Sequence, residues 1–243
     1  YLIDAATRQL IWRAEWGEQY LQGPSFTQHP QLLYAIPSAV ALYDRHGDGI
    51  ADFAFVGDVA GQVWRVTLPA CKEDSCQHKG VALNLIAAFS VSDTLLDRRF
   101  FHAPAVWRSQ AKTLIAIASS NVEKPHDRLS DNALFVFFDN GSQLVRPEHL
   151  SNISLCANKD CAFEQGWFLP LRKGEQAEAS PWYDGRYLWL RTVESQLPQC
   201  GAVLPETVRL YRIAMEANKV RQIDEVEVAA DSIFAQLDNS NSG

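Results

Sequence analysis

The feature of this sequence that most restricts its fold is a repeated succession of a proline and an aromatic residue. Each copy starts with a strand-like segment that carries a proline, runs through an apolar segment, and closes on a segment with an aromatic residue. A near-constant separation of about 30 residues between the proline and the aromatic residue predicts successive units of three or four strands, the size of one blade of a β-propeller. The pairs are Pro37 and Trp64, Pro104 and Phe135, and Pro181 and Tyr211, separated by 27, 31 and 30 residues.

The segments between these markers have the character of short β-strands. Runs such as 53–56, 114–117 and 134–138 are rich in Val, Ile, Leu and Phe and are bounded by turn residues. Almost no segment has helical periodicity. The sequence therefore predicts an all-β fold that is β-propeller-like, with a partial ring of about three to four blades in this chain.

The two ends of the chain suggest that it is a fragment of a longer polypeptide. We expect residues 1–230 to form a fragment of a larger propeller domain, and residues 231–243 to form a short helix and a disordered tail. Residues 1–12 resemble the closing hairpin of an earlier unit. The sequence has no initiator Met and no signal peptide, so we expect a processed piece of a longer polypeptide that supplies the remaining blades.

The charge and hydropathy of the chain argue against two kinds of partner. The 22 Lys and Arg residues against 29 Asp and Glu give a net charge of −7, and no basic tract is present to neutralise a phosphate backbone. We therefore expect no nucleic-acid partner. The longest uncharged stretch, 19–43, is interrupted by one glycine and three prolines, so no membrane span is expected.

The five cysteines indicate an oxidising compartment. Cys71 and Cys76 are separated by four residues, as are Cys156 and Cys161, and both pairs lie in polar, loop-like sequence. Two local disulfides are favoured over a four-thiolate zinc site, because zinc sites of that kind favour turn glycines between their cysteines. Disulfides imply the periplasm, the cell surface or the exterior. Cys200 is either free or paired with a cysteine elsewhere in the parent protein.

Residues 44–52, Asp-Arg-His-Gly-Asp-Gly-Ile-Ala-Asp, have the spacing of a calcium-binding loop. Acidic residues stand at loop positions 1, 5 and 9, a glycine at position 6, and a carbonyl would supply position 7. Position 12 lacks the glutamate of an EF-hand, so we expect the loop to join two strands. The expected Ca²⁺ ligand positions are Asp44, His46, Asp48, Ile50 and Asp52; the alternative is an acidic turn without metal.

His46 occupies position 3, where an acidic or amide ligand is expected. Because imidazole is a poor ligand for a hard cation, we expect its ring to point away and water or backbone to substitute. The affinity for Ca²⁺ should then be weak, with a dissociation constant of about 10⁻⁴–10⁻³ M.

Residues 57–65, which follow directly, predict a tight hairpin. Gly57 and Gly61 favour positive φ, and Asp58 is expected to accept hydrogen bonds from the turn's own backbone. Trp64 is expected to be a core residue between blades. The six histidines are scattered, and neither a His-Glu-x-x-His nor a Gly-x-Ser-x-Gly motif occurs, so we expect no catalytic residues and no enzyme.

These motifs resemble the C-terminal domain of the PilY family, large proteins associated with the tips of bacterial type IV pili. The resemblance extends from near position 1 to about position 215. It is carried chiefly by the joined segments 44–52 and 57–65. Further matching segments are Leu2 to Thr7, Gly166 to Leu171, Gly174-Glu175, Cys200 and Leu210 to Ile213.

The resemblance implies a β-propeller-like domain with a calcium site that regulates pilus extension and retraction, and a role in pilus assembly and surface adhesion. The implied partners are minor pilins, other components of the pilus tip, other regions of the same parent protein, and a host-cell or abiotic surface. The implied location is the cell surface at the pilus tip, reached through the periplasm and outer membrane. His46 departs from the ligand usual in the family.

Two other functions are compatible with parts of the sequence. Residues 3–7 followed by Trp12 also resemble the tryptophan-docking repeat of quinoprotein dehydrogenase propellers, and binding of pyrroloquinoline quinone would discriminate that function. An integrin-like calcium propeller module shares the Asp-rich loop before a strand. It would predict several such loops at blade spacing, whereas one is present.

Overall fold

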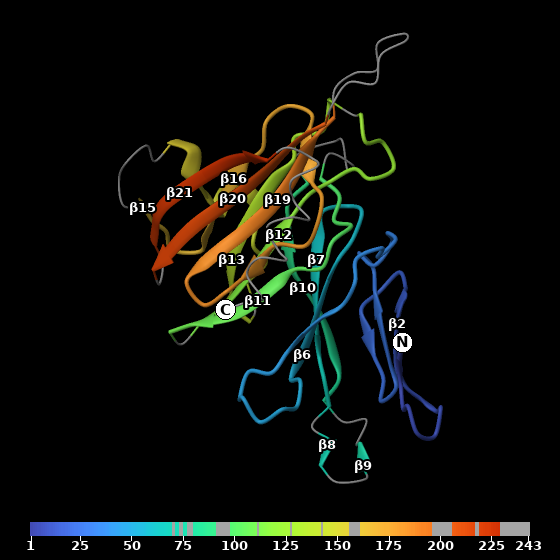
Figure 1. Ribbon diagram of the computed structural model, residues 1–243. Coiled ribbons are helices and arrows are strands. Elements are labelled where there is room, and N and C mark those ends of the chain that lie inside the picture. The colour runs from blue at the N-terminus through green and yellow to red at the C-terminus, as the bar shows by residue number, and fades with distance from the viewer. Residues whose placement is uncertain are drawn as a thin grey trace.

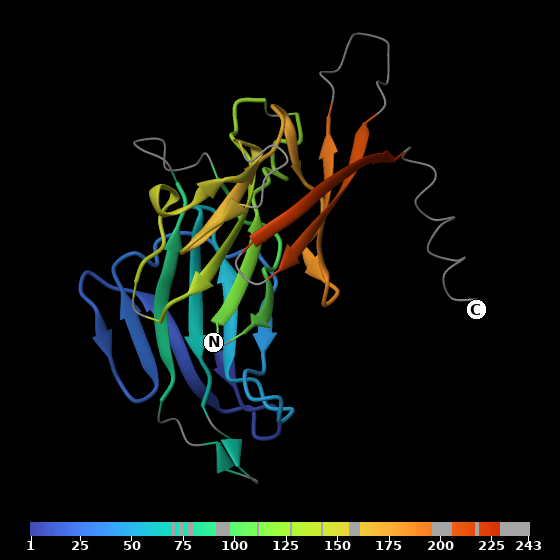
Figure 2. The ribbon, with the colours of Figure 1, turned by 90° about the vertical axis from the view of Figure 1, so that its left-hand side faces the viewer.

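The computed structural model describes residues 1–69, 71–72, 75–76, 80–90, 98–110, 112–126, 128–141, 143–155, 161–195, 206–216 and 219–228. Over these residues the chain is almost entirely β-structure, so the predicted all-β class is confirmed. The helical elements among them are two short 3-10 turns, η1 (Pro147–His149) and η2 (Ile153–Leu155). The sheets follow one another in chain order, and Figures 1 and 2 show the first and the last at opposite ends.

The first sheet contains the hairpin predicted for residues 1–12. Its strands, in spatial order, are β1 (Leu2–Ile3), β2 (Leu10–Trp16), β4 (Phe26–His29) and β3 (Leu21–Gln22). The β1–β2 pair is antiparallel, whereas β2 and β4 are parallel. Asp4 closes the hairpin, since its Oδ1 accepts the amides of Ala6 at 2.9 Å and Thr7 at 2.7 Å.

Three further sheets follow, and each contains four antiparallel strands in chain order, as in a propeller blade. The first blade is β5 (Ala41–Tyr43), β6 (Phe53–Gly57), β7 (Gln62–Thr67) and β10 (Ala82–Ala88). The second is β11 (Ala105–Ser109), β12 (Lys112–Ala118), β13 (Ala133–Asp139) and β16 (Gly166–Pro170). The third is β18 (Trp182–Tyr183), β19 (Tyr187–Glu194), β20 (Thr207–Glu216) and β21 (Lys219–Val228).

Short strands extend these blades at their edges. Strand β14 (Ser151–Asn152) pairs with β16, β17 (Glu175–Ala177) with β19, and β15 (Cys161–Ala162) with β21. The first strands of the three blades are neighbours, because β11 contacts both β5 and β18. The first strands of the blades therefore lie side by side along one inner edge, and the blades together form a propeller-like arc.

The repeat found in the sequence corresponds to the blades, with one exception. Each aromatic marker is buried in the third strand of its blade: Trp64 in β7, Phe135 in β13 and Tyr211 in β20. Two proline markers, Pro104 and Pro181, are buried and directly precede the first strand.

The third proline marker, Pro37, does not match the other two. Pro37 is exposed and stands four residues before β5, so its predicted equivalence is wrong. The reason lies in the next residue. Ser38 Oγ donates to the Gly57 carbonyl at 3.0 Å and accepts the Gly57 amide at 2.9 Å, so a side chain, and not strand pairing, holds this segment against β6.

Apolar side chains fill the space between successive sheets. One cluster, with Trp12 and Trp64, lies between the first sheet and the first blade. A second, in which the rings of Phe89 and Phe135 stack at 4.3 Å, lies between the first and second blades. A third, with Trp167, joins the second and third blades. Each blade is thus stabilised by its neighbour, because one sheet face alone buries too little apolar surface.

Of the two predicted cysteine pairs, Cys71 and Cys76 both lie among the described residues, as does Cys161 of the second pair. The backbone of Cys71 pairs directly with that of Cys76 in a hairpin of β8 (Cys71–Lys72) and β9 (Ser75–Cys76). Directly opposite residues of an antiparallel pair have Cα atoms about 4.5–5.5 Å apart, a separation that a disulfide can bridge. Both disulfides stay predictions. Cys156, Cys200 and residues 231–243 lie outside the described part of the chain.

Candidate functional site

The predicted calcium loop, residues 44–52, connects β5 to β6 in the first blade. Asp44 organises its first half: Oδ1 accepts the amides of His46 at 3.1 Å and Gly47 at 2.6 Å, and Oδ2 accepts the amide of Gly49 at 2.7 Å. Gly47 and Gly49 have φ angles of +73° and +85°, which other residues rarely adopt. These amide hydrogen bonds, that of Gly49 first, lower the pKa of Asp44 below its ordinary value.

The other two acidic residues also bind groups of the loop itself. Asp48 Oδ1 accepts the amide of Ile50 at 3.0 Å, and Asp52 Oδ2 accepts the amide of Arg45 at 2.6 Å. The Nδ1 atom of His46 lies 2.8 Å from Asp52 Oδ1. The His46 ring thus has a carboxylate partner within the loop, and the expectation that it points away from a bound ion stays a prediction.

The donor chemistry of the loop suits Ca²⁺, whereas the side chains are not arranged around one point. Three carboxylates and a backbone carbonyl are hard oxygen ligands of the kind that Ca²⁺ prefers. Within the described ranges, however, no group of three or more His, Cys, Asp or Glu side chains has an arrangement that could hold a metal ion. Asp48 and Asp52 would have to turn from their present partners to share an ion with Asp44.

The turn that follows the next strand is built as expected. Asp58 is buried, its Oδ1 accepts the amides of Ala60 and Gln62 at 2.9 Å each, and its Oδ2 accepts Trp64 Nε1 at 2.9 Å. Burial raises the pKa of Asp58, and the three hydrogen bonds oppose that rise. The Asp58 side chain thus joins the β6–β7 turn to the core residue Trp64, which is a structural role.

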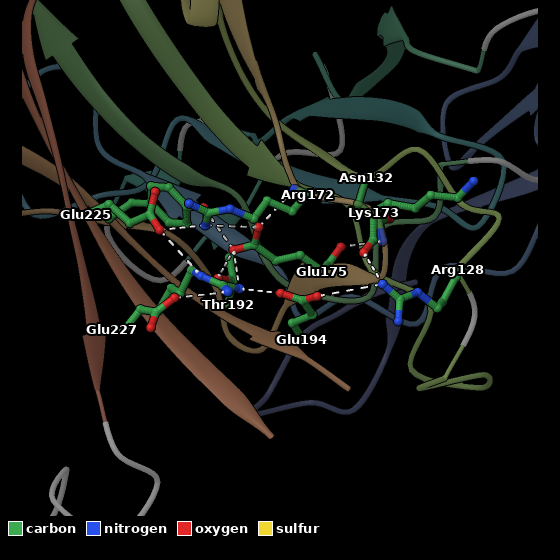
Figure 3. A network of polar contacts seen from close by, with 11 residues as sticks. Arg128, Asn132, Arg172, Lys173, Glu175, Thr192, Glu194, Glu225 and Glu227 are labelled. Atoms are coloured by element: carbon green, nitrogen blue, oxygen red, sulfur yellow. Dashed lines mark hydrogen bonds and ion pairs between the residues drawn. The ribbon is translucent and has the colours of Figure 1, made fainter. Parts of the chain in front are cut away.

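A buried polar network in the third blade was not predicted from the sequence (Figure 3). At its centre Glu175 on β17 is fully buried. Its Oε1 accepts the hydroxyls of Thr192 at 2.5 Å and Tyr211 at 2.9 Å, and its Oε2 accepts the amide of Arg172 at 2.9 Å. The guanidinium groups of Arg172 and Arg209 each lie 3.9 Å from a Glu175 oxygen.

Arg209 extends this network across the strands of the blade. Its guanidinium lies 2.8 Å from Glu194, 3.4 Å from Glu225 and 3.2 Å from Glu227, so one cation joins β19, β20 and β21. These three glutamates are labelled in Figure 3. Burial, together with the nearby charge of Glu175, raises the pKa of Tyr211, and its hydroxyl stays a donor. The network therefore holds the edge strand β17 to the blade. The segments that carry the family resemblance include Gly174-Glu175, but the two hydroxyl partners of Glu175, on Thr192 and Tyr211, lie 17 and 36 residues away in the sequence.

The comparisons with known proteins point to the same fold. No protein-family model matches the chain, and no curated protein matches it by sequence. The structure is similar to that of the Pseudomonas aeruginosa PilY1 C-terminal domain, with a TM-score of 0.53 and 15% identity. The match covers 74% of this chain and 47% of that one, so this chain spans about half its length. The relationship is distant and structural.

At this level of identity the likeness shows the fold alone. The three blades and the hairpin before them are β-propeller-like, which confirms the predicted architecture. A search for membrane-crossing helices in the described part of the chain finds none of sufficient length and apolarity.

Proposed function

We propose that this chain is part of a type IV pilus-associated protein, a non-enzymatic module that acts in pilus biogenesis and surface adhesion. The observation that carries the proposal is the similarity of its arc of blades to the PilY1 C-terminal domain. It is supported by the position of segments 44–52 and 57–65, which carried the sequence resemblance. Together with the strands that flank them, they form the consecutive β5–β6 and β6–β7 connections of one blade.

Both ends of the arc carry exposed apolar side chains suited to contact with partners. In the first sheet Trp16 on β2 is 51% exposed, and Leu21 on β3, on the other side of β4, is also 51% exposed. In the third blade Trp182 is 44% and Val226 58% exposed. Large exposed apolar side chains are frequent in interaction surfaces. Under this proposal they meet pilus-tip components or other regions of the parent protein at the cell surface.

The proposed function has a direct genetic test. Removing the segment that encodes residues 1–228 from the source organism should lower the amount of pilin shed from the cell surface and the number of cells retained on a solid surface. Immunoblotting of sheared pilin and counting of adherent cells measure these two effects. Re-expression of the intact gene is the control. Unchanged surface pilin and unchanged adhesion together would exclude the proposed role.

We further propose that the loop of residues 44–52 binds Ca²⁺ weakly. Its oxygen donors suit the ion, but Asp52 is held by the Arg45 amide and by the His46 ring. Binding must break these contacts, which lowers the affinity. We expect a dissociation constant of about 10⁻⁴–10⁻³ M in the wild type.

Substitutions in the loop should change this affinity in opposite directions. His46→Asp should tighten Ca²⁺ binding roughly tenfold, because ligand charge tunes the affinity of such loops and because the substitution frees Asp52. Asp48→Ala should abolish binding, whereas Glu148→Ala in η1, outside the loop, should leave it unchanged. Isothermal titration calorimetry with CaCl₂ measures all three. No heat of binding in the wild type, and none after His46→Asp, would mean that the loop is only a turn.

A further inference from the structure

A cavity of about 230 Å³ lies between the first and second blades, beside the predicted calcium loop of residues 44–52. The first blade contributes Arg45 from the loop, Phe53 at the start of β6 and Arg65 from β7. The second contributes Lys112 at the start of β12 and Asp139 at the end of β13. The cavity is therefore assembled only when the two blades pack together.

The charges that line this cavity are unbalanced. Three cations face one carboxylate, which leaves a net charge of +2 in a chain whose total is −7. Asp139 is already paired, since Arg65 Nη1 lies 2.5 Å from its Oδ2 and both side chains are largely buried. Among the described residues, neither Arg45 nor Lys112 has a carboxylate partner.

Two of the three cationic groups, those of Arg65 and Lys112, are also held in place. The Arg65 guanidinium lies 5.3 Å from the centre of the Phe53 ring, and the buried Arg65 Nε atom has no hydrogen-bond partner. The Lys112 ammonium lies 4.5 Å from the centre of the Phe138 ring. The Arg45 side chain is exposed and reaches the cavity from the loop, whose backbone is fixed there by the Asp52 carboxylate at 2.6 Å. A site whose charges are positioned in advance needs little ordering to bind a ligand.

We propose that this cavity binds an oxyanion, a carboxylate or phosphate group that Arg45 and Lys112 contact together. Guanidinium groups bind both kinds of oxyanion through paired hydrogen bonds, and an ammonium adds a point charge. A concave site with a net positive charge also concentrates anions. The oxyanion is either a free small anion or the acidic side chain of a partner protein. Binding of an oxyanion at this cavity requires neither Ca²⁺ in the loop nor a role of the protein in the pilus.

Calorimetric titration of inorganic phosphate into the whole chain, at low ionic strength and without calcium, tests the proposal. We expect measurable binding that weakens roughly tenfold in Lys112→Gln and in Arg45→Gln, because each removes one hydrogen bond to a charged group. Both side chains are exposed, so neither variant should unfold, and circular dichroism checks this. The matched control is Arg186→Gln, an exposed arginine of the third blade that lies over Tyr187.

A second arm distinguishes the sources of the oxyanion. A capped tetraglutamate peptide is titrated in the same way, with tetraglutamine as its neutral counterpart. Binding of tetraglutamate that also weakens in Lys112→Gln would support a site for a partner's acidic side chains. Binding of phosphate alone, weakened in both variants, would support a site for a free anion. Absence of binding by both probes, or binding that neither substitution changes, would overturn the proposal.

Discussion

Replacing Glu175 by alanine is expected to lower the free energy of unfolding by about 3–5 kcal/mol, the cost typical of removing one partner from a buried charge network. The carboxylate is fully buried and accepts the hydroxyls of Thr192 and Tyr211. Without it, those two donors lose an acceptor that water cannot replace, and the buried Arg209 cation loses one of its neighbouring carboxylates, at 3.9 Å. Urea unfolding followed by far-UV circular dichroism measures the change.

Two other variants define what Glu175 contributes. Glu175→Gln keeps the shape and the hydroxyl acceptor but removes the charge, so its effect should be smaller than that of Glu175→Ala. Glu178→Ala removes a partly exposed carboxylate just beyond the same edge strand, whose ion pair with Arg191 spans 2.8 Å. Its cost should stay within about 1 kcal/mol, as for surface ion pairs. Equal effects of Glu175→Ala and Glu178→Ala would contradict the structural role of the network.

Replacing Trp64 by alanine is expected to destabilise the protein by a similar amount, about 3–5 kcal/mol, because a large cavity forms in the core. Trp64 is fully buried among residues that join the first sheet to the first blade, including Trp12. The substitution also removes the Nε1 donor of the buried Asp58. Thermal and urea unfolding should both report the loss.

A matched pair of substitutions separates the two causes. Trp64→Phe keeps most of the apolar volume and removes the indole N–H, so its cost reports chiefly on the Asp58 hydrogen bond, about 1–3 kcal/mol for a buried acceptor left unpaired. Trp16→Ala truncates a half-exposed tryptophan of the first sheet and should cost much less. Equal destabilisation by Trp16→Ala and Trp64→Ala would contradict the role of Trp64 as the residue that fills the core between the first sheet and the first blade.

The local features of this protein are encoded in short stretches of sequence. Strand segments between turn residues predict the all-β class, and the near-constant spacing to Trp64, Phe135 and Tyr211 predicts repeated units. Each aromatic residue is expected in the closing strand of its unit, whereas a fourth strand follows it in the structure. Asp58 caps its own turn as expected, because the amides it accepts lie within four residues. Such features can be predicted, since strand alternation and turn chemistry act over a few neighbouring residues.

Other features arise only when distant segments meet. The spacing of Asp44, Asp48 and Asp52 predicts calcium ligands, yet side-chain torsions and the contact with His46 decide where the carboxylates point. Pro37 matches the repeat in sequence, but the hydrogen bonds of Ser38 give it a different environment.

The Glu175 network and the cationic cavity depend entirely on tertiary structure. Glu175 meets Tyr211 from 36 residues away, and Arg65 meets Asp139 from 74 residues away. By itself the sequence determined the strands, the turns and the order of the blades. The packing of blade against blade decided which charges are buried together, because that depends on the register and twist of whole sheets and not on any local pattern.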